Sequence, residues 1–200
     1  MRTLSRLLAA QAGLILLLVA VSPSSTAQGA TSPLRDGLHV SVGVGSASVS
    51  ASCVSCETDF FNDRTTGFSG IAQIGGTVTS RLVLAAEFAG WINNDAVLDR
   101  RIASLNVVLL GYPSDNHGFF LKSGIGGLRA VAENELGYIA TDTFTSQIGI
   151  GYDVPVGAVD LTPYVTYIRT FYGETSVNGF LSSEVVYPNA IQAGVALTLH

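Results

Sequence analysis

The sequence predicts an all-β protein that folds as one up-and-down barrel of eight antiparallel strands, and three observations support this prediction. Apolar and polar residues alternate with a period of two in one segment after another, whereas no segment after residue 30 has a convincing helical period. The connections between these segments alternate in length, as they do in up-and-down barrels. The polar positions are mostly small and uncharged, which suits the narrow interior of an eight-stranded barrel.

The eight predicted strands follow each other with little sequence between them. They cover residues 37–50, two strands within 67–92 joined by a tight turn near Thr79 and Ser80, and then 101–112, 117–130, 142–153, 159–172 and 188–200. Short connections fall at 79–80, 113–116 and 154–158, and long ones at 51–66, 93–100, 131–141 and 173–187. The alternation predicts one rim of tight turns and one rim of longer loops.

The N-terminus has the features of a secretory signal peptide. Arg2 and Arg6 precede an apolar stretch, residues 7–21, and Ala27 ends a small-x-small cleavage pattern. The apolar stretch is shorter than the roughly 18–20 residues that a membrane-spanning helix needs. We therefore expect a signal peptide at 1–27 that directs export through the Sec pathway, a short extension at 28–35, and one barrel domain at 36–200.

The composition favours a membrane over water around the barrel. Hydrophobic residues make up 48% of the chain and charged residues only 12%, with a net charge of −5 and a single lysine, Lys122. This balance argues against a nucleic-acid partner. An apolar face on every strand would aggregate in water, whereas in lipid it is stable, and closure of the barrel satisfies the backbone hydrogen bonds. Aromatic residues near the strand ends fit interfacial girdles: Phe68, Phe88, Trp91, Tyr112, Phe119, Phe144, Tyr152, Phe171, Tyr172 and Tyr187.

The chain resembles the small outer-membrane β-barrel proteins of Gram-negative bacteria, the OmpA-like and OmpX-like barrels, over nearly all of residues 36–200. The resemblance is carried by the signal peptide, by "GFFLKSGIGGLRA" (118–130), by "VDLTPYVTYIRTFY" (159–172) and by the amphipathic last strand. It implies location in the outer membrane, contact with its lipid and lipopolysaccharide, and insertion by the barrel-assembly machinery through the last strand. Members usually end in an aromatic residue, and this chain departs from them by ending in Leu199 and His200.

Several polar residues are expected to point into the barrel: Gln73, Glu87, Lys122, Gln147 and Arg169. A charge in a narrow interior is costly unless it is paired, so Glu87 is expected to pair with Lys122 or Arg169. The facing of the strand 159–172 stays open, because Tyr164 and Tyr167 fall on opposite faces. These residues act either as a plug that fills the interior or as the lining of a narrow pore.

The sequence predicts no catalytic, cofactor-binding or metal-binding site. His39, His117 and His200 are expected to lie far apart, and none belongs to a hydrolase or metalloprotease motif. The long loops are acidic, which suits binding of divalent cations, bridging to lipopolysaccharide phosphates or simple solvation. Their acids are Glu57, Asp59, Asp63, Asp95, Asp99, Glu133, Glu135, Glu174 and Glu184, against Arg64 and Arg100.

The two cysteines, Cys53 and Cys56, are separated by two residues in the first long loop. A zinc site would need two more ligands, and a thioredoxin-like pair would need a βαβ unit. In an oxidising compartment the spacing predicts a disulfide that stiffens the loop.

The predicted function is that of a monomeric, integral outer-membrane barrel with a structural or surface-interaction role, without enzymatic activity and without a wide pore. Two alternatives remain open at this point. The first is narrow-channel transport of ions or small solutes, and the second is a soluble exported barrel that binds a ligand.

Overall fold

A computed structural model describes residues 37–54, 64–94, 98–115, 117–135, 137–182 and 185–200, with the side chains of Cys53 and Val54 excepted. The predicted signal peptide and the extension at 28–35 lie outside the described residues and stay predictions. Among the described residues there is no helix long and apolar enough to cross a membrane.

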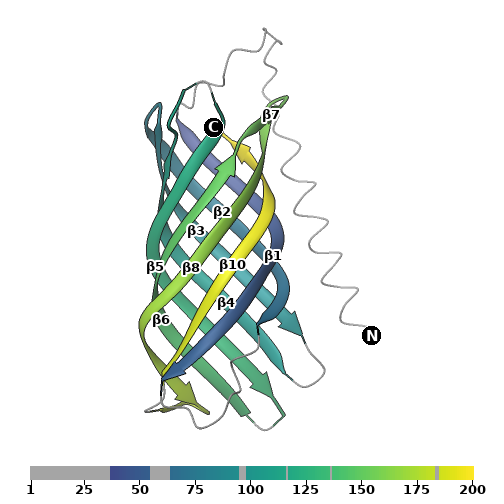
Figure 1. Ribbon diagram of the computed structural model, residues 1–200, viewed down its shortest axis with the longest axis vertical. Coiled ribbons are helices and arrows are strands. Elements are labelled where there is room, and N and C mark those ends of the chain that lie inside the picture. Colours follow the sequence, from purple (N-terminus) through teal and green to yellow (C-terminus); the bar gives the residue numbers. More distant parts are fainter. Residues whose placement is uncertain (1–36, 55–63, 95–97, 116, 136, 183–184) are drawn as a thin grey trace. The chain divides into compact units, whose positions relative to one another are not determined.

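The described residues form one closed antiparallel barrel of eight long strands, with two short strands at its ends (Figure 1). The long strands are β1 (Leu38–Val54), β2 (Thr65–Thr79), β3 (Leu82–Asn94), β4 (Asp99–Gly111), β5 (Phe119–Asn134), β6 (Gly137–Tyr152), β8 (Val159–Val177) and β10 (Val185–Leu199). Each long strand pairs with the next, and β10 pairs with both β8 and β1. The predicted all-β, up-and-down barrel is therefore confirmed.

The short strands extend two of the connections. β7 (Val154–Val156) pairs with the start of β8, and β9 (Phe180–Leu181) pairs with its end. We call the end of the barrel at which β1 begins and β10 finishes the terminal end, and the opposite end the loop end. In Figure 1 the C-terminus and β7 mark the terminal end.

The predicted long loops are shorter than expected, because the strands continue into them. β5 and β6 stay paired up to Asn134 and Gly137, so most of the expected loop at 131–141 is sheet. The Asn134 side chain accepts a hydrogen bond from the Gly137 amide, and Gly137 has a positive φ, which closes the turn tightly. The alternation of apolar and polar residues fades here, so hydrophobic periodicity alone could not find the extension.

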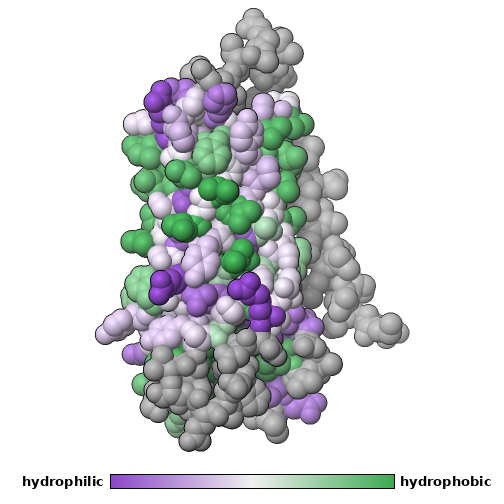
Figure 2. All heavy atoms as spheres, in the orientation of Figure 1, coloured by the Kyte–Doolittle hydropathy of each residue, from purple (hydrophilic) through white to green (hydrophobic). Residues whose placement is uncertain are grey.

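The two faces of the sheet have opposite chemistry. Large apolar side chains point outward and are exposed, as Leu105 and Ile125 are at 64% and 68%. The interior holds many Ser, Thr, Asn and Gln side chains, as predicted. It also holds apolar clusters that were not predicted, such as Val83, Leu110 and Phe120. Figure 2 shows hydrophobic residues over the middle of the visible wall, with hydrophilic residues mostly toward the two ends. An exterior of this kind is suited to lipid, since in water it would drive aggregation.

Two aromatic residues expected on the outer girdles lie inside. Trp91 is buried near the loop end, where its Nε1 donates to the Ala47 carbonyl oxygen at 2.9 Å. Tyr112 is buried at the terminal end against Phe120. Each of the two residues is two positions along the strand from other buried residues and therefore points inward. The period of two thus predicts the direction of these side chains better than their position near a strand end does.

Candidate functional site inside the barrel

The middle of the interior holds a charged group that four strands build together. The Lys122 Nζ on β5 donates to Glu87 Oε2 on β3 at 2.9 Å, and the Gln147 Nε2 on β6 donates to Glu87 Oε1 at 2.8 Å. Gln73 on β2, directly opposite Glu87 in the register, donates to the same carboxylate. We call Gln73, Glu87, Lys122 and Gln147 the Glu87 cluster.

Both oxygens of the Glu87 carboxylate are paired, and the cluster is nearly inaccessible to solvent. Glu87 is 1% exposed and Lys122 is 5% exposed, and their opposite charges cancel. The ammonium group also lies 5.8 Å from the centre of the Tyr164 ring, close enough for a cation–π interaction. Burying two ions costs several kcal/mol each, and only such direct pairing with further hydrogen bonds compensates for that cost.

Arg169, the fifth residue expected inside, points outward. Along β8 the even-numbered residues from Asp160 to Thr170 are buried, which places Tyr164 inside and leaves Arg169 and Tyr167 exposed on the outer face. The expectation that Arg169 faces the interior is therefore wrong. The sequence alone did not decide which face of this strand points inward, because Tyr164 and Tyr167 lie on opposite faces and a tyrosine fits either lipid or a barrel core.

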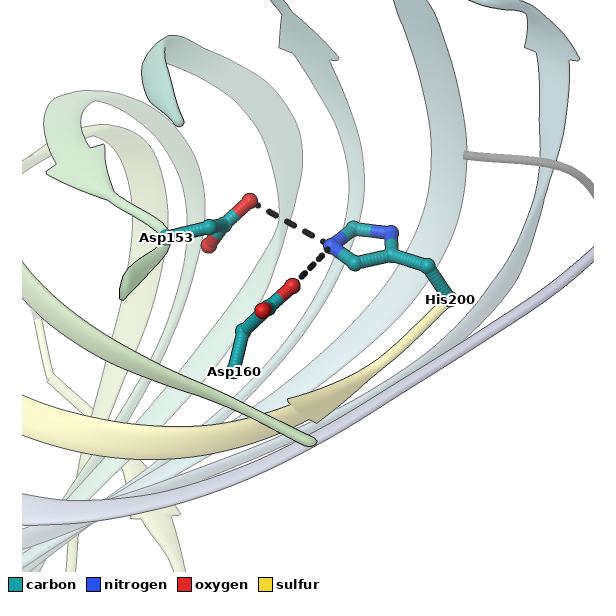
Figure 3. A group of neighbouring side chains, drawn as sticks. All are labelled: Asp153, Asp160 and His200. Atoms are coloured by element: carbon teal, nitrogen blue, oxygen red, sulfur yellow. Dashed lines mark hydrogen bonds and ion pairs between the residues drawn. The ribbon is translucent and has the colours of Figure 1, made fainter. Parts of the chain in front are cut away.

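A second polar group lies at the terminal end (Figure 3). The His200 Nε2 lies 3.3 Å from Asp153 Oδ2 and 3.5 Å from Asp160 Oδ2. The three side chains are only 3%, 3% and 8% exposed, in the order His200, Asp153, Asp160. We call Asp153, Asp160 and His200 the terminal cluster.

Neighbouring hydroxyl groups hold Asp153 in place. Tyr112 donates to its Oδ2 at 2.9 Å, and Thr162 donates to its Oδ1 at 2.8 Å. Thr162 is linked in turn to Thr198, and Thr198 to Ser41, through hydroxyl contacts of 2.9 Å each. Burial raises the pKa of Asp153, but the hydrogen bonds from His200, Thr162 and Tyr112 outweigh it and lower this pKa below its usual value.

The histidines are not all far apart, contrary to the expectation from the sequence. The His39 and His200 rings lie 5.1 Å apart, because β1 pairs with β10 and brings Val40 opposite Leu199. His39 lies between the two polar groups and contacts Gln73 through its Nε2 at 3.1 Å. The alternation that puts His39 inside, combined with closure between the first and last strands, could have revealed this proximity.

The interior between the two groups is almost filled. A residual cavity lined by His39, Gln73, Lys122, Asp153 and Tyr164, among others, measures about 10 Å³. A single water molecule needs about that much room. This cavity beside the Glu87 cluster therefore has room for about one water molecule.

The cysteine prediction lies mostly outside the described residues. β1 continues to Val54, so Cys53 belongs to a strand and not to a loop, opposite Val186. Cys56 is outside the described part of the chain, and the disulfide stays a prediction.

A closed antiparallel barrel with a polar, filled interior and an apolar exterior defines the class of small membrane-spanning β-barrels of the outer-membrane type. Solved structures of this class are similar to the chain. Neisserial surface protein A matches with a TM-score of 0.52 and 18% identity over 80% of this chain and 95% of its own.

Two further structures are similar but less so. One is Ail, the attachment invasion locus protein of Yersinia pestis, with a TM-score of 0.49 and 11% identity over 82% of this chain and 99% of its own. The other is OprG from Pseudomonas aeruginosa, with a TM-score of 0.49 and 13% identity over 83% of this chain and 97% of its own. No family model and no curated protein sequence matches the chain. The match to the Neisserial protein shows the fold.

Proposed function

We propose that the protein is a monomeric, integral outer-membrane barrel with a structural or surface-interaction role, and that it conducts neither ions nor solutes. The observation that carries this proposal is the closed interior, in which the Glu87 cluster crosses the barrel from β2 to β6. The apolar exterior supports a membrane location and weighs against the soluble ligand-binding alternative. The filled interior likewise weighs against the channel alternative.

The proposed orientation places the terminal end in the periplasm and the loop end at the cell surface. Both the start of β1 and the finish of β10 lie at the terminal end, together with the turn at Ser80 and Arg81. Short periplasmic turns are typical of outer-membrane barrels. In this orientation the barrel-assembly machinery would engage β10, and the loop end would carry the surface interactions. We propose that these are binding interactions and not catalysis.

The proposal predicts that the purified protein gives no channel steps in planar lipid bilayers. A wide porin reconstituted in parallel checks that the bilayers report conductance. Reproducible single-channel steps from the folded protein, absent after it has been unfolded by boiling, would support the transport alternative instead.

A lipid partner is supported by a groove on the outer wall near the loop end. The groove has a volume of about 500 Å³, and Phe68, Phe88 and Ile92 stand along it with small residues between them. Arg101 and Arg129 lie on adjacent strands at the same groove, although each already contacts an acid, Glu133 and Asp142 respectively. An apolar groove beside two guanidinium groups suits a lipid with acyl chains and phosphates, the chemistry of lipopolysaccharide.

The same two arginines lie close to acidic residues. Arg101 lies 3.4 Å from Glu133, and Arg129 lies 3.9 Å from Asp142, so these two acids have basic neighbours. Glu57, Asp59, Asp63, Asp95 and Glu184 lie outside the described residues. Cation bridging by the acidic loops stays a proposal.

Replacing both Arg101 and Arg129 by glutamine is expected to reduce the lipopolysaccharide that co-purifies with the barrel several-fold, because the phosphates lose bidentate partners. Phosphate analysis of protein extracted in mild detergent measures this. Arg81→Gln, at the terminal end beside Asp115, is the matched control and should leave the bound lipid unchanged. Equal amounts of bound lipid in the unmodified protein and both variants would show that the groove does not bind lipopolysaccharide.

A further inference from the structure

We propose that Asp153, Asp160 and His200 bind one divalent transition-metal ion of the Zn²⁺ type, which ties the end of β10 to the β6–β8 connection. This inference does not depend on the proposed surface role. It rests on the geometry, the charge and the surroundings of the terminal cluster.

The spacing of the three side chains fits the ligand set of a metal ion. The His200 Nε2 faces carboxylate oxygens of Asp153 and Asp160 at 3.3 and 3.5 Å, long distances for hydrogen bonds to a carboxylate. One Nε2 proton also cannot serve both carboxylates well. A tetrahedral ion with bonds of about 2.0–2.1 Å separates its ligand atoms by about 3.3–3.4 Å. One ligand atom from each of the three residues lies within 4.8 Å of the other two, so small adjustments complete the set.

The charge also calls for a cation. Two buried carboxylates lie beside each other and beside His200 at this end of the interior. The Glu87 cluster cannot offset them, because Lys122 is already paired with Glu87. One divalent ion would balance the charge of both carboxylates.

An independent observation comes from His39 beside the cluster. His39 is 2% exposed, and its Nε2 donates to Gln73 Oε1, so the neutral ring carries its lone pair on Nδ1. That Nδ1 has no hydrogen-bond partner among the described residues, and neither has the Nδ1 of His200. Buried, unpaired nitrogens in a native protein mark places where water or an ion belongs.

The hydrogen bonds around Asp153 resemble the outer shell of a metal site. Tyr112 and Thr162 each donate to one of its oxygens, which fixes the carboxylate before any ion arrives. The set of one nitrogen and two carboxylates suits Zn²⁺ and related ions, whereas Ca²⁺ takes six to eight oxygen ligands. Three protein ligands leave the fourth position of a tetrahedron to water. A bound ion would therefore link the end of β10 to the β6–β8 connection.

The test uses the full-length folded barrel in detergent, stripped of metal with a chelator and titrated with ZnCl₂ by calorimetry. We expect one ion per chain and an unfolding temperature that rises with zinc concentration, because the ion binds the folded state. Co²⁺ in place of Zn²⁺ should give the visible absorption of a tetrahedral site. His200→Gln and Asp160→Asn should weaken binding at least 100-fold, and Tyr112→Phe about 10–100-fold.

Asp115→Asn is the matched control, since Asp115 lies at the same end, is exposed and pairs with Arg81. It should bind zinc as the unmodified protein does. If His200→Gln fails to fold, the zinc-dependent unfolding temperature and the Co²⁺ spectrum of the unmodified protein decide alone. Absence of saturable binding, or equal affinity in folded His200→Gln, would overturn the proposal. The three side chains would then be held together by hydrogen bonds without a metal ion.

Discussion

Replacing Glu87 by alanine is expected to lower the free energy of unfolding by about 3–5 kcal/mol, because it strands the Lys122 ammonium in the interior. The substitution also leaves the amide groups of Gln73 and Gln147 without their acceptor. Urea unfolding of the barrel in lipid vesicles measures the change, and the chain carries its own probe, since Trp91 is its one tryptophan and is buried.

The double variant Glu87→Leu, Lys122→Met separates the ion pair from its packing. Replacing both partners by apolar residues of similar volume removes the stranded charge, so the double variant should be more stable than Glu87→Ala. Arg81→Gln breaks an exposed ion pair and should change stability little. If Glu87→Gln unfolds at the same temperature and urea concentration as the unmodified protein, the Glu87 cluster does not stabilise the barrel.

The second large effect concerns the outer wall. Replacing Ile125 by arginine is expected to cost about 2–4 kcal/mol in a bilayer, because Ile125 lies near the middle of β5 with an exposed, outward side chain. The matched control is Val177→Arg, at the loop end of β8, where an interfacial arginine costs about 0–1 kcal/mol. Unfolding in lipid vesicles reports both values. Equal effects at the two positions would mean that the wall does not face hydrocarbon.

The period of two carried most of the fold prediction. It placed Glu87, Lys122, Gln73 and Gln147 on interior faces, and the structure brings these four side chains into contact. The strand lengths were harder to predict, because the regular alternation of apolar and polar residues fades toward the strand ends. For this reason β8 runs five residues past the predicted end at 172, to Val177.

The terminal cluster escaped prediction for a different reason. Asp153 lies just after β6, Asp160 at the start of β8 and His200 just after β10, so the three residues are separated in the sequence. Their meeting depends on the closing pairs β1–β10 and β8–β10, which are contacts between residues far apart in the chain. Short motifs carry no information about such contacts. The proximity of His39 to His200 could have been predicted, since the inward direction of His39 and the closure of the barrel were both expected from the sequence.

The protein is expected to reside in the outer membrane, with its apolar exterior in contact with lipid. Fractionation of cells, followed by gel electrophoresis of heated and unheated samples, tests this expectation most directly. We expect the protein in the outer-membrane fraction, released only by detergent, with a different mobility before and after boiling because the closed barrel resists unheated detergent. Recovery in the soluble fraction, with one mobility in both samples, would contradict the account.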